Sequence, residues 1–150
     1  MTCVDLNNEK KYKILLQHIF KECDEIMFHF PILDRKKYSI EDLASDYDYY
    51  IKEKEKFITE LFKNGATQKK SKIYQGISLG YETQIIKVKL YPNLIKKLEK
   101  HHLYNWLWWN GLPEDPCFFS KNTCRFLTIS HEDLFYICDE KQDYDIIRLL

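Results

Sequence analysis

Apolar residues recur with a helical period in two stretches of the N-terminal half of the chain. Between Asn8 and Phe28, the apolar side chains fall on one face of a helix and the lysines on the other. Pro31 ends this stretch, because a proline disfavours helical geometry at the residue before it. A second amphipathic stretch begins at Ser39, a residue type that caps helix N-termini, and ends at Asn64-Gly65. The pattern predicts two N-terminal amphipathic helices.

The period changes to two after residue 72, which predicts a β-hairpin. Apolar and polar residues alternate on both sides of the turn sequence GYET at 80–83. Pairing Leu79 with Gln84 would gather the apolar side chains on one face. That buried face would carry Ile73, Ile77, Leu79, Ile86, Val88 and Leu90, and the solvated face Tyr74, Ser78, Lys87 and Lys89.

A third helix and three short strands are predicted after the hairpin. Pro92 is typical of the first turn of a helix, and helical spacing continues to about Asn110-Gly111. Turn residues at Lys121-Asn122 and at 130–133 then separate three apolar runs. The predicted fold class is α+β: two N-terminal amphipathic helices, a β-hairpin, a third helix and a C-terminal three-stranded antiparallel meander. Without repeats or linkers, one domain spanning residues 1–150 is expected.

The composition is that of a globular protein, and it excludes several classes of partner. Hydrophobic residues make up 45% of the chain and charged residues 31%, with 23 basic and 23 acidic side chains. Since the net charge is zero, we expect no nucleic-acid binding. The N-terminus shows no secretory signal and no apolar run is long enough to cross a bilayer, so we expect no membrane association and a cytoplasmic location.

The five cysteines fit free thiols in a reducing compartment. Cys117, Cys124, His131 and Cys138 follow one another at intervals of seven residues, and three cysteines with one histidine are a familiar zinc-binding set. In the predicted meander, however, Cys117 and Cys124 share one face, whereas Cys138 opposes Arg125 on the other. We therefore expect buried thiols, with no metal site and no cofactor.

The turn at residues 130–133 carries the strongest candidate for chemistry. His131, Glu132 and Asp133 place an imidazole beside two carboxylates, a set that serves acid–base catalysis or ligand binding. The pattern Ser130-x-x-Asp133 also fits a cap of a turn or helix. No phosphate loop, hydrolase elbow or zinc-protease motif accompanies it. The sequence therefore favours a binding protein over an enzyme and predicts no catalytic residue.

Three indoles are followed by two acids in the segment before the first C-terminal strand. Trp108, Trp109, Glu114 and Asp115 all lie in this segment, shortly after Trp106. An exposed indole flanked by carboxylates would anchor a basic protein partner or stack on a ligand. A loop folded over the edge of the sheet would instead bury all three indoles.

Three functions are compatible with these features. The first is a small cytoplasmic protein-binding module, such as an inhibitor or an immunity or anti-defence protein that occludes its partner. The second is a binding protein for a small molecule or a nucleotide-derived ligand. The third is a small metal- or Cys-His-dependent enzyme using Cys117, Cys124 and His131. Homodimers are also compatible with aromatic-rich strand edges. In each case we expect the loop at 106–116 to meet the turn at 130–133 at one end of the sheet.

Overall fold

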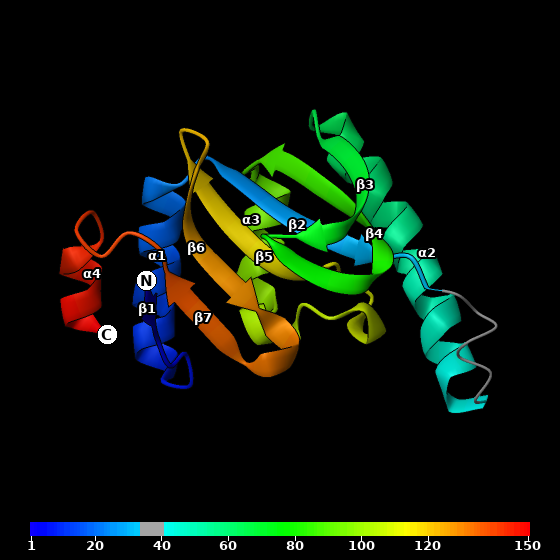
Figure 1. The fold of residues 1–150 in the computed structure, drawn as a ribbon, viewed down its shortest axis with the longest axis horizontal. Coiled ribbons are helices and arrows are strands. Elements are labelled where there is room, and N and C mark those ends of the chain that lie inside the picture. Colours follow the sequence, from blue (N-terminus) through cyan, green and yellow to red (C-terminus); the bar gives the residue numbers. More distant parts are fainter. Residues whose placement is uncertain (34–40) are drawn as a thin grey trace.

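The computed structural model describes residues 1–33 and 41–150, and its centre is an antiparallel sheet (Figure 1). Seven strands form the sheet in the order β1-β7-β6-β5-β2-β4-β3. The strands are β1 (Thr2–Cys3), β2 (Glu25–Pro31), β3 (Thr67–Tyr74), β4 (Ile77–Lys89), β5 (Glu114–Ser120), β6 (Thr123–Ile129) and β7 (Leu134–Ile137). Ser39, the predicted cap of the second helix, lies outside the described residues.

Helices cover one face of this sheet. They are α1 (Glu9–Glu22), α2 (Glu41–Lys63), α3 (Pro92–Lys100) and α4 (Tyr144–Leu149), with short 3₁₀ turns η1 (Leu103–Asn105), η2 (Trp108–Asn110) and η3 (Ser130–Glu132). All four α-helices contribute side chains to one core cluster with that face of the sheet. Figure 1 shows α1, α2 and α3 behind the strands, with α4 beside α1. Within the described residues, no helix has the length and apolar character needed to cross a membrane.

Strand β2 overturns the predicted pair of helices that precede the sheet. The first helix begins after Asn8, whose side chain accepts a hydrogen bond from the Lys11 amide at 3.0 Å, and it ends at Cys23, whose backbone is extended. The residues after it form a strand that pairs with β4 on one side and β5 on the other. The prediction of one helix from Asn8 to Phe28 was wrong, because a short apolar run satisfies both helical and strand periods.

The β3–β4 hairpin turns at residues other than the predicted ones. Gln75 and Gly76 have φ angles of 51° and 75°, as a two-residue type I′ turn requires, while the sequence GYET lies inside β4. The predicted faces are therefore exchanged at the tip of the hairpin. Tyr74 is buried, and Ile73 and Ile77 are 57% and 48% exposed.

The predicted C-terminal meander is not a sheet of its own. Its residues form β5, β6 and β7, but β5 also pairs with β2, and β7 with β1. The predicted third helix ends early, at Lys100, and η1 and η2 lead from it to β5. The predicted fold class was thus wrong in the number and order of its elements, although the protein is α+β.

Part of the second face of the sheet is covered by the sheet's own edge. Tyr74 lies on β3, three strand spacings from β5, which would be about 14 Å in a flat sheet. Yet its hydroxyl donates to the backbone carbonyl of Asp115 on β5 at 2.6 Å. The tip of the hairpin must therefore curl over the sheet, where Tyr74 packs in a small cluster with Ile85, Cys117 and Phe119.

Candidate functional site

A pocket of about 300 Å³ lies beneath the curled tip of the hairpin. Tyr74, Leu79 and Tyr81 line it from the hairpin. The end of β6 and η3 line the opposite side with Leu127, Ile129, His131 and Glu132, and Asp115 reaches it from β5. The curl of β3 and β4 is what creates this enclosure, since a flat sheet would leave the same face open.

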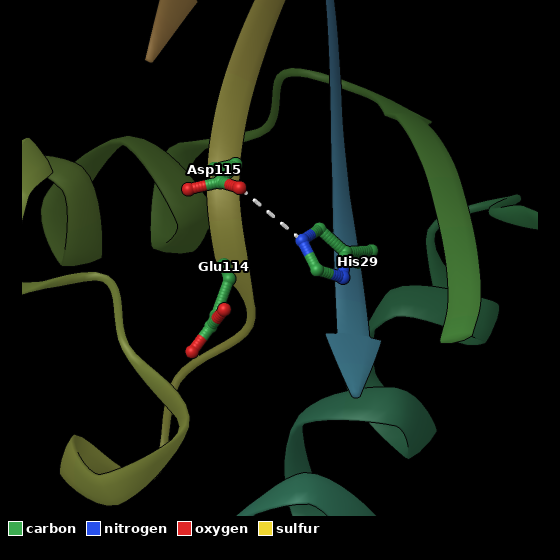
Figure 2. A group of neighbouring side chains, drawn as sticks. All are labelled: His29, Glu114 and Asp115. Carbon is green, nitrogen blue, oxygen red and sulfur yellow. Dashed lines mark hydrogen bonds and ion pairs between the residues drawn. The ribbon is translucent and has the colours of Figure 1, made fainter. Parts of the chain in front are cut away.

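Asp115 occupies a bulge in β5. Met27 pairs with Cys117 and His29 with Glu114, so Asp115 and Pro116 together face a single residue of β2. Asp115 has a left-handed φ of 53°, which aspartate tolerates better than most residues, and Pro116 lacks the amide hydrogen that a regular strand would use. Bulges redirect side chains. Here the Asp115 carboxylate faces β2, as Figure 2 shows.

His29 is fully buried and lies directly opposite that carboxylate. Its Nε2 atom is 3.4 Å from Asp115 Oδ2, and its Nδ1 atom is 2.7 Å from the hydroxyl of Thr83 on β4. The Tyr74 ring covers the imidazole at a centroid distance of 4.6 Å. Burial raises the pKa of Tyr74 well above its usual value, so this side chain remains a neutral hydroxyl donor.

Glu114 adds a second buried carboxyl group beside Asp115. Its Oε1 atom accepts a hydrogen bond from the Trp108 amide at 3.2 Å. Burial, with a smaller contribution from the charge of Asp115, raises the pKa of Glu114 to about 7. A carboxyl group with such a pKa is costly to keep ionised inside a protein, and strongly shifted groups of this kind concentrate at functional sites.

Part of the predicted site comes together at the pocket. Asp115 Oδ1 accepts a hydrogen bond from the Ser130 amide at 2.7 Å and lies 3.9 Å from His131 Nδ1. His131 Nε2 is in turn 3.6 Å from Glu132 Oε1. Because the Ser130 hydroxyl donates to the Leu103 carbonyl, it does not cap the turn as the sequence pattern suggested. Asp115, His131 and Glu132 thus form one wall of the pocket.

The other predicted binding residues lie elsewhere. Trp108 and Trp109 are in η2, where the Trp108 ring contacts Tyr50 of α2. Trp109 is 44% exposed, Trp108 is half-buried, and Trp106 is fully buried in the core. Asp133 follows η3 in a left-handed conformation and lines a separate cavity near Tyr12.

The cysteines are arranged differently from the prediction. Cys138 does oppose Arg125, whose carbonyl accepts its amide hydrogen. Its side chain is nevertheless next to Cys124, with the two sulfur atoms 3.9 Å apart, so the predicted separation of these thiols was wrong. The cause is an irregularity in the β5–β6 register, where Phe118 pairs with Phe126 but Phe119 pairs with Cys124. Arg125 is the extra residue, and it brings Cys124 and Cys138 to the same face of the sheet.

Sequence reasoning missed His29, Thr83 and Tyr74. His29 is the one polar side chain in the run IMFHFP, and a buried imidazole needs polar partners. A polar residue in an apolar run would have indicated a buried site only if the run had been recognised as a central strand. Tyr74 and Thr83 had no such signal, because their positions depend on the curl of the hairpin.

Thr83, His29 and Asp115 resemble a nucleophile–base–acid series, but their hydrogen bonds exclude that role. The Thr83 hydroxyl is fully buried and donates its single proton to the Phe30 carbonyl at 2.9 Å. It therefore accepts a hydrogen bond from His29, whereas a nucleophile would donate one.

No family model matches the chain, and no curated protein or solved structure matches it either. The arrangement is a pocket with the buried ionisable groups His29 and Glu114 next to its Asp115 wall.

Proposed function

We propose that the protein binds a small organic cation, such as an amine with an apolar body, in the pocket beneath the hairpin tip. The observation that carries this proposal is the set of side chains that line the pocket. Two carboxylates, Asp115 and Glu132, and two tyrosine rings, Tyr74 and Tyr81, lie along it. Neither lysine nor arginine is among its described lining residues. Carboxylates and aromatic rings both attract an ammonium group.

The rest of the lining suits the apolar part of such a ligand. Leu79, Leu127 and Ile129 are among its lining residues, so an alkyl or aryl group would leave water on binding. The volume of about 300 Å³ is at the lower end of ligand pockets, which favours a small metabolite over a cofactor. A nucleotide phosphate would meet carboxylates without a compensating cation, so the charge disfavours the nucleotide-derived ligand considered from the sequence.

Occlusion of a protein partner, the first function expected from the sequence, stays a prediction. It was favoured by the aromatic excess, by acidic surface runs and by the lack of a catalytic motif, and its anchor was to be an exposed indole flanked by acids. Trp109 is exposed, but Glu114 and Asp115 are buried and do not accompany it on the surface. The pocket therefore supports ligand binding more directly.

A panel of matched small molecules tests the proposal. Primary and quaternary amines, their neutral isosteres, and carboxylates of the same size would be compared by thermal shift and by chemical-shift changes in NMR spectra. We expect amines alone to stabilise the protein, with changes at Tyr81, Ile129 and His131. Glu132→Gln should weaken amine binding about tenfold, the value of a charge-assisted hydrogen bond. Glu99→Gln, an exposed change on α3, is the control and should leave binding unchanged.

Two results would contradict the proposal. One is equal stabilisation by neutral isosteres and amines, which would assign the binding to the apolar wall alone. The other is unchanged binding in Leu127→Trp, because an indole at that position should fill the pocket.

A further inference from the structure

We propose that His29, Glu114 and Asp115 form a binding site for a divalent transition-metal ion of the Zn²⁺ type. This inference goes beyond the proposed function, because His29 and Glu114 lie behind the pocket and only Asp115 belongs to both sites. One nitrogen or oxygen atom from each of the three side chains lies within 4.8 Å of the others, and all three side chains are buried.

The spacing of His29 and Asp115 is that of two ligands on one ion. Their facing atoms, Nε2 and Oδ2, are 3.4 Å apart. Two ligands about 2.1 Å from a zinc ion are separated by roughly 3.4 Å at a tetrahedral angle. A direct hydrogen bond between an imidazole and a carboxylate is normally shorter, at about 2.7–2.9 Å. The distance thus fits a shared ion better than a direct bond.

The hydrogen bonds of Thr83 select the tautomer that a metal requires. Since the Thr83 hydroxyl gives its proton to Phe30, it can only accept from His29 Nδ1. The Nδ1 atom therefore carries a hydrogen, and in the neutral imidazole the Nε2 lone pair points towards Asp115. A lone pair facing a carboxylate is repulsive unless a proton or a metal ion lies between them. An outer partner that fixes the second nitrogen is typical of histidines that ligate metals.

The charges of the buried carboxylates also favour a metal ion at this position. Two adjacent carboxylates are buried here, with Glu114 5% and Asp115 6% exposed. Within the described part of the chain, the ion pairs of Asp115 are with His29 and His131, and no lysine or arginine neutralises either carboxylate. A divalent cation would compensate both charges.

Glu114 would complete the coordination by turning. Figure 2 shows it next to Asp115 on β5, with its carboxylate displaced from the line between Asp115 and His29. The three candidate ligand atoms lie within 4.8 Å of one another, whereas two ligands on a tetrahedral zinc ion are roughly 3.4 Å apart. A small movement of the Glu114 carboxylate would bring it to ligand distance. Rotation of its flexible side chain supplies that movement.

The ligand types restrict the ion. One imidazole with two carboxylates suits Zn²⁺, Mn²⁺ or Fe²⁺, whereas Mg²⁺ and Ca²⁺ prefer oxygen ligands alone. Zn²⁺ binds more tightly than Mn²⁺ or Fe²⁺ at most such sites. We therefore choose Zn²⁺ as the probe and Mg²⁺ as its control.

Calorimetric titration of chelator-treated wild-type protein tests the site. We expect one Zn²⁺ per chain and no measurable binding of Mg²⁺. Glu114→Gln should weaken Zn²⁺ binding at least about tenfold, and Thr83→Val about 10–100-fold through loss of the outer hydrogen bond. Glu132→Gln is the matched control, because it removes a carboxylate from the pocket wall and leaves the three ligands intact. It should weaken amine binding but not Zn²⁺ binding, so the two proposals fail separately.

An exposed alternative at His131 must be distinguished from this site. His131 lies between Asp115 and Glu132 at the protein surface, and histidine–carboxylate groups there also bind zinc weakly. His131→Ala should leave the Zn²⁺ affinity unchanged. If this variant loses zinc while Glu114→Gln keeps it, the proposal is wrong.

The wild-type protein provides a measurement that does not depend on whether variants fold. The ¹⁵N chemical shifts of the His29 ring should show a protonated Nδ1 in both states and a metal-bound Nε2 after Zn²⁺ is added. An Nε2 atom that stays protonated at saturating Zn²⁺ would overturn the proposal. It would establish a buried imidazolium–carboxylate pair instead.

Discussion

Asp143 accepts two hydrogen bonds from the guanidinium of Arg125, at 3.0 Å and 2.5 Å, and neither side chain is more than 2% exposed. The pair joins the segment before α4 to the middle of β6. Asp143→Ala would leave a buried guanidinium without its counter-charge, so we expect it to lower the free energy of unfolding by about 3–5 kcal/mol. Urea denaturation measures this. Asp145→Ala, an exposed change in the first turn of α4, should lower the free energy of unfolding by less than about 0.5 kcal/mol.

Gly111 provides a test of close packing between η2 and α2. Its φ is 73°, and an added Cβ would lie 2.7 Å from the Tyr49 ring and 3.1 Å from Glu53 Cβ. Gly76 has a similar φ of 75° with no atom within 4 Å of the added carbon. Gly76→Ala should therefore lower the free energy of unfolding by about 1–2 kcal/mol, which is the cost of holding an alanine in the left-handed conformation. Gly111→Ala should cost about 1–3 kcal/mol more, and equal losses of stability would contradict this packing.

Thr128 carries a buried hydroxyl that has no hydrogen-bond partner among the described residues. Valine has nearly the same shape and no polar atom to desolvate. We expect Thr128→Val to raise the free energy of unfolding by about 1 kcal/mol. Thr123→Val at the exposed start of β6 serves as the control for strand propensity. If Thr128→Val lowers the stability and Thr123→Val does not, the Thr128 hydroxyl must have a hydrogen-bond partner.

The thiols should differ in their rates of alkylation. Cys3 is exposed. Burial raises the pKa of Cys23 to about 12, and a hydrogen bond with Cys117 is the main cause that raises the pKa of Cys124 to about 12. Since the thiolate is the reacting form, iodoacetamide at pH 8 should label Cys3 well before the other two. Peptide mass spectrometry measures the order in which the cysteines are labelled. In denatured protein the cysteines should be alkylated at similar rates. Labelling of Cys124 as fast as Cys3 would refute the expectation.

The errors in the predicted fold have one physical origin, which is that local patterns do not reveal strand partners. The residues from Ile26 to Phe30 suit a helix by spacing and a strand by alternation, and pairing with β4 and β5 decides the matter. The hairpin turn was misplaced for a related reason. Gln75-Gly76 suits a two-residue turn, but the sequence GYET contains more residues that are typical of turns, so the turn was predicted there.

The candidate site was predictable only where its residues are close in the sequence. Asp115 and His131 were identified because acids follow the indoles and a histidine lies in a polar turn. Their contact with each other follows from antiparallel strands, which bring alternate connections to one end of a sheet. His29 was missed because it falls between the end of the predicted helix at Phe28 and Pro31, where no strand was expected. Its partner Thr83 lies 54 residues away, and no local signal joins the two.

The place of β2 in the sheet affects how the chain folds as it is synthesised. Once Lys89, the last residue of β4, has left the ribosome, β2 can pair with β4. The other edge of β2 has no partner until β5 emerges, because Glu25 of β2 pairs with Phe119 of β5. During that interval a strand that carries Ile26, Phe28 and Phe30 has one edge without a partner, and such edges recruit strands from other molecules. The nascent protein is therefore most prone to aggregate before β5 leaves the ribosome, and chain truncation between β4 and β5 would prolong that state.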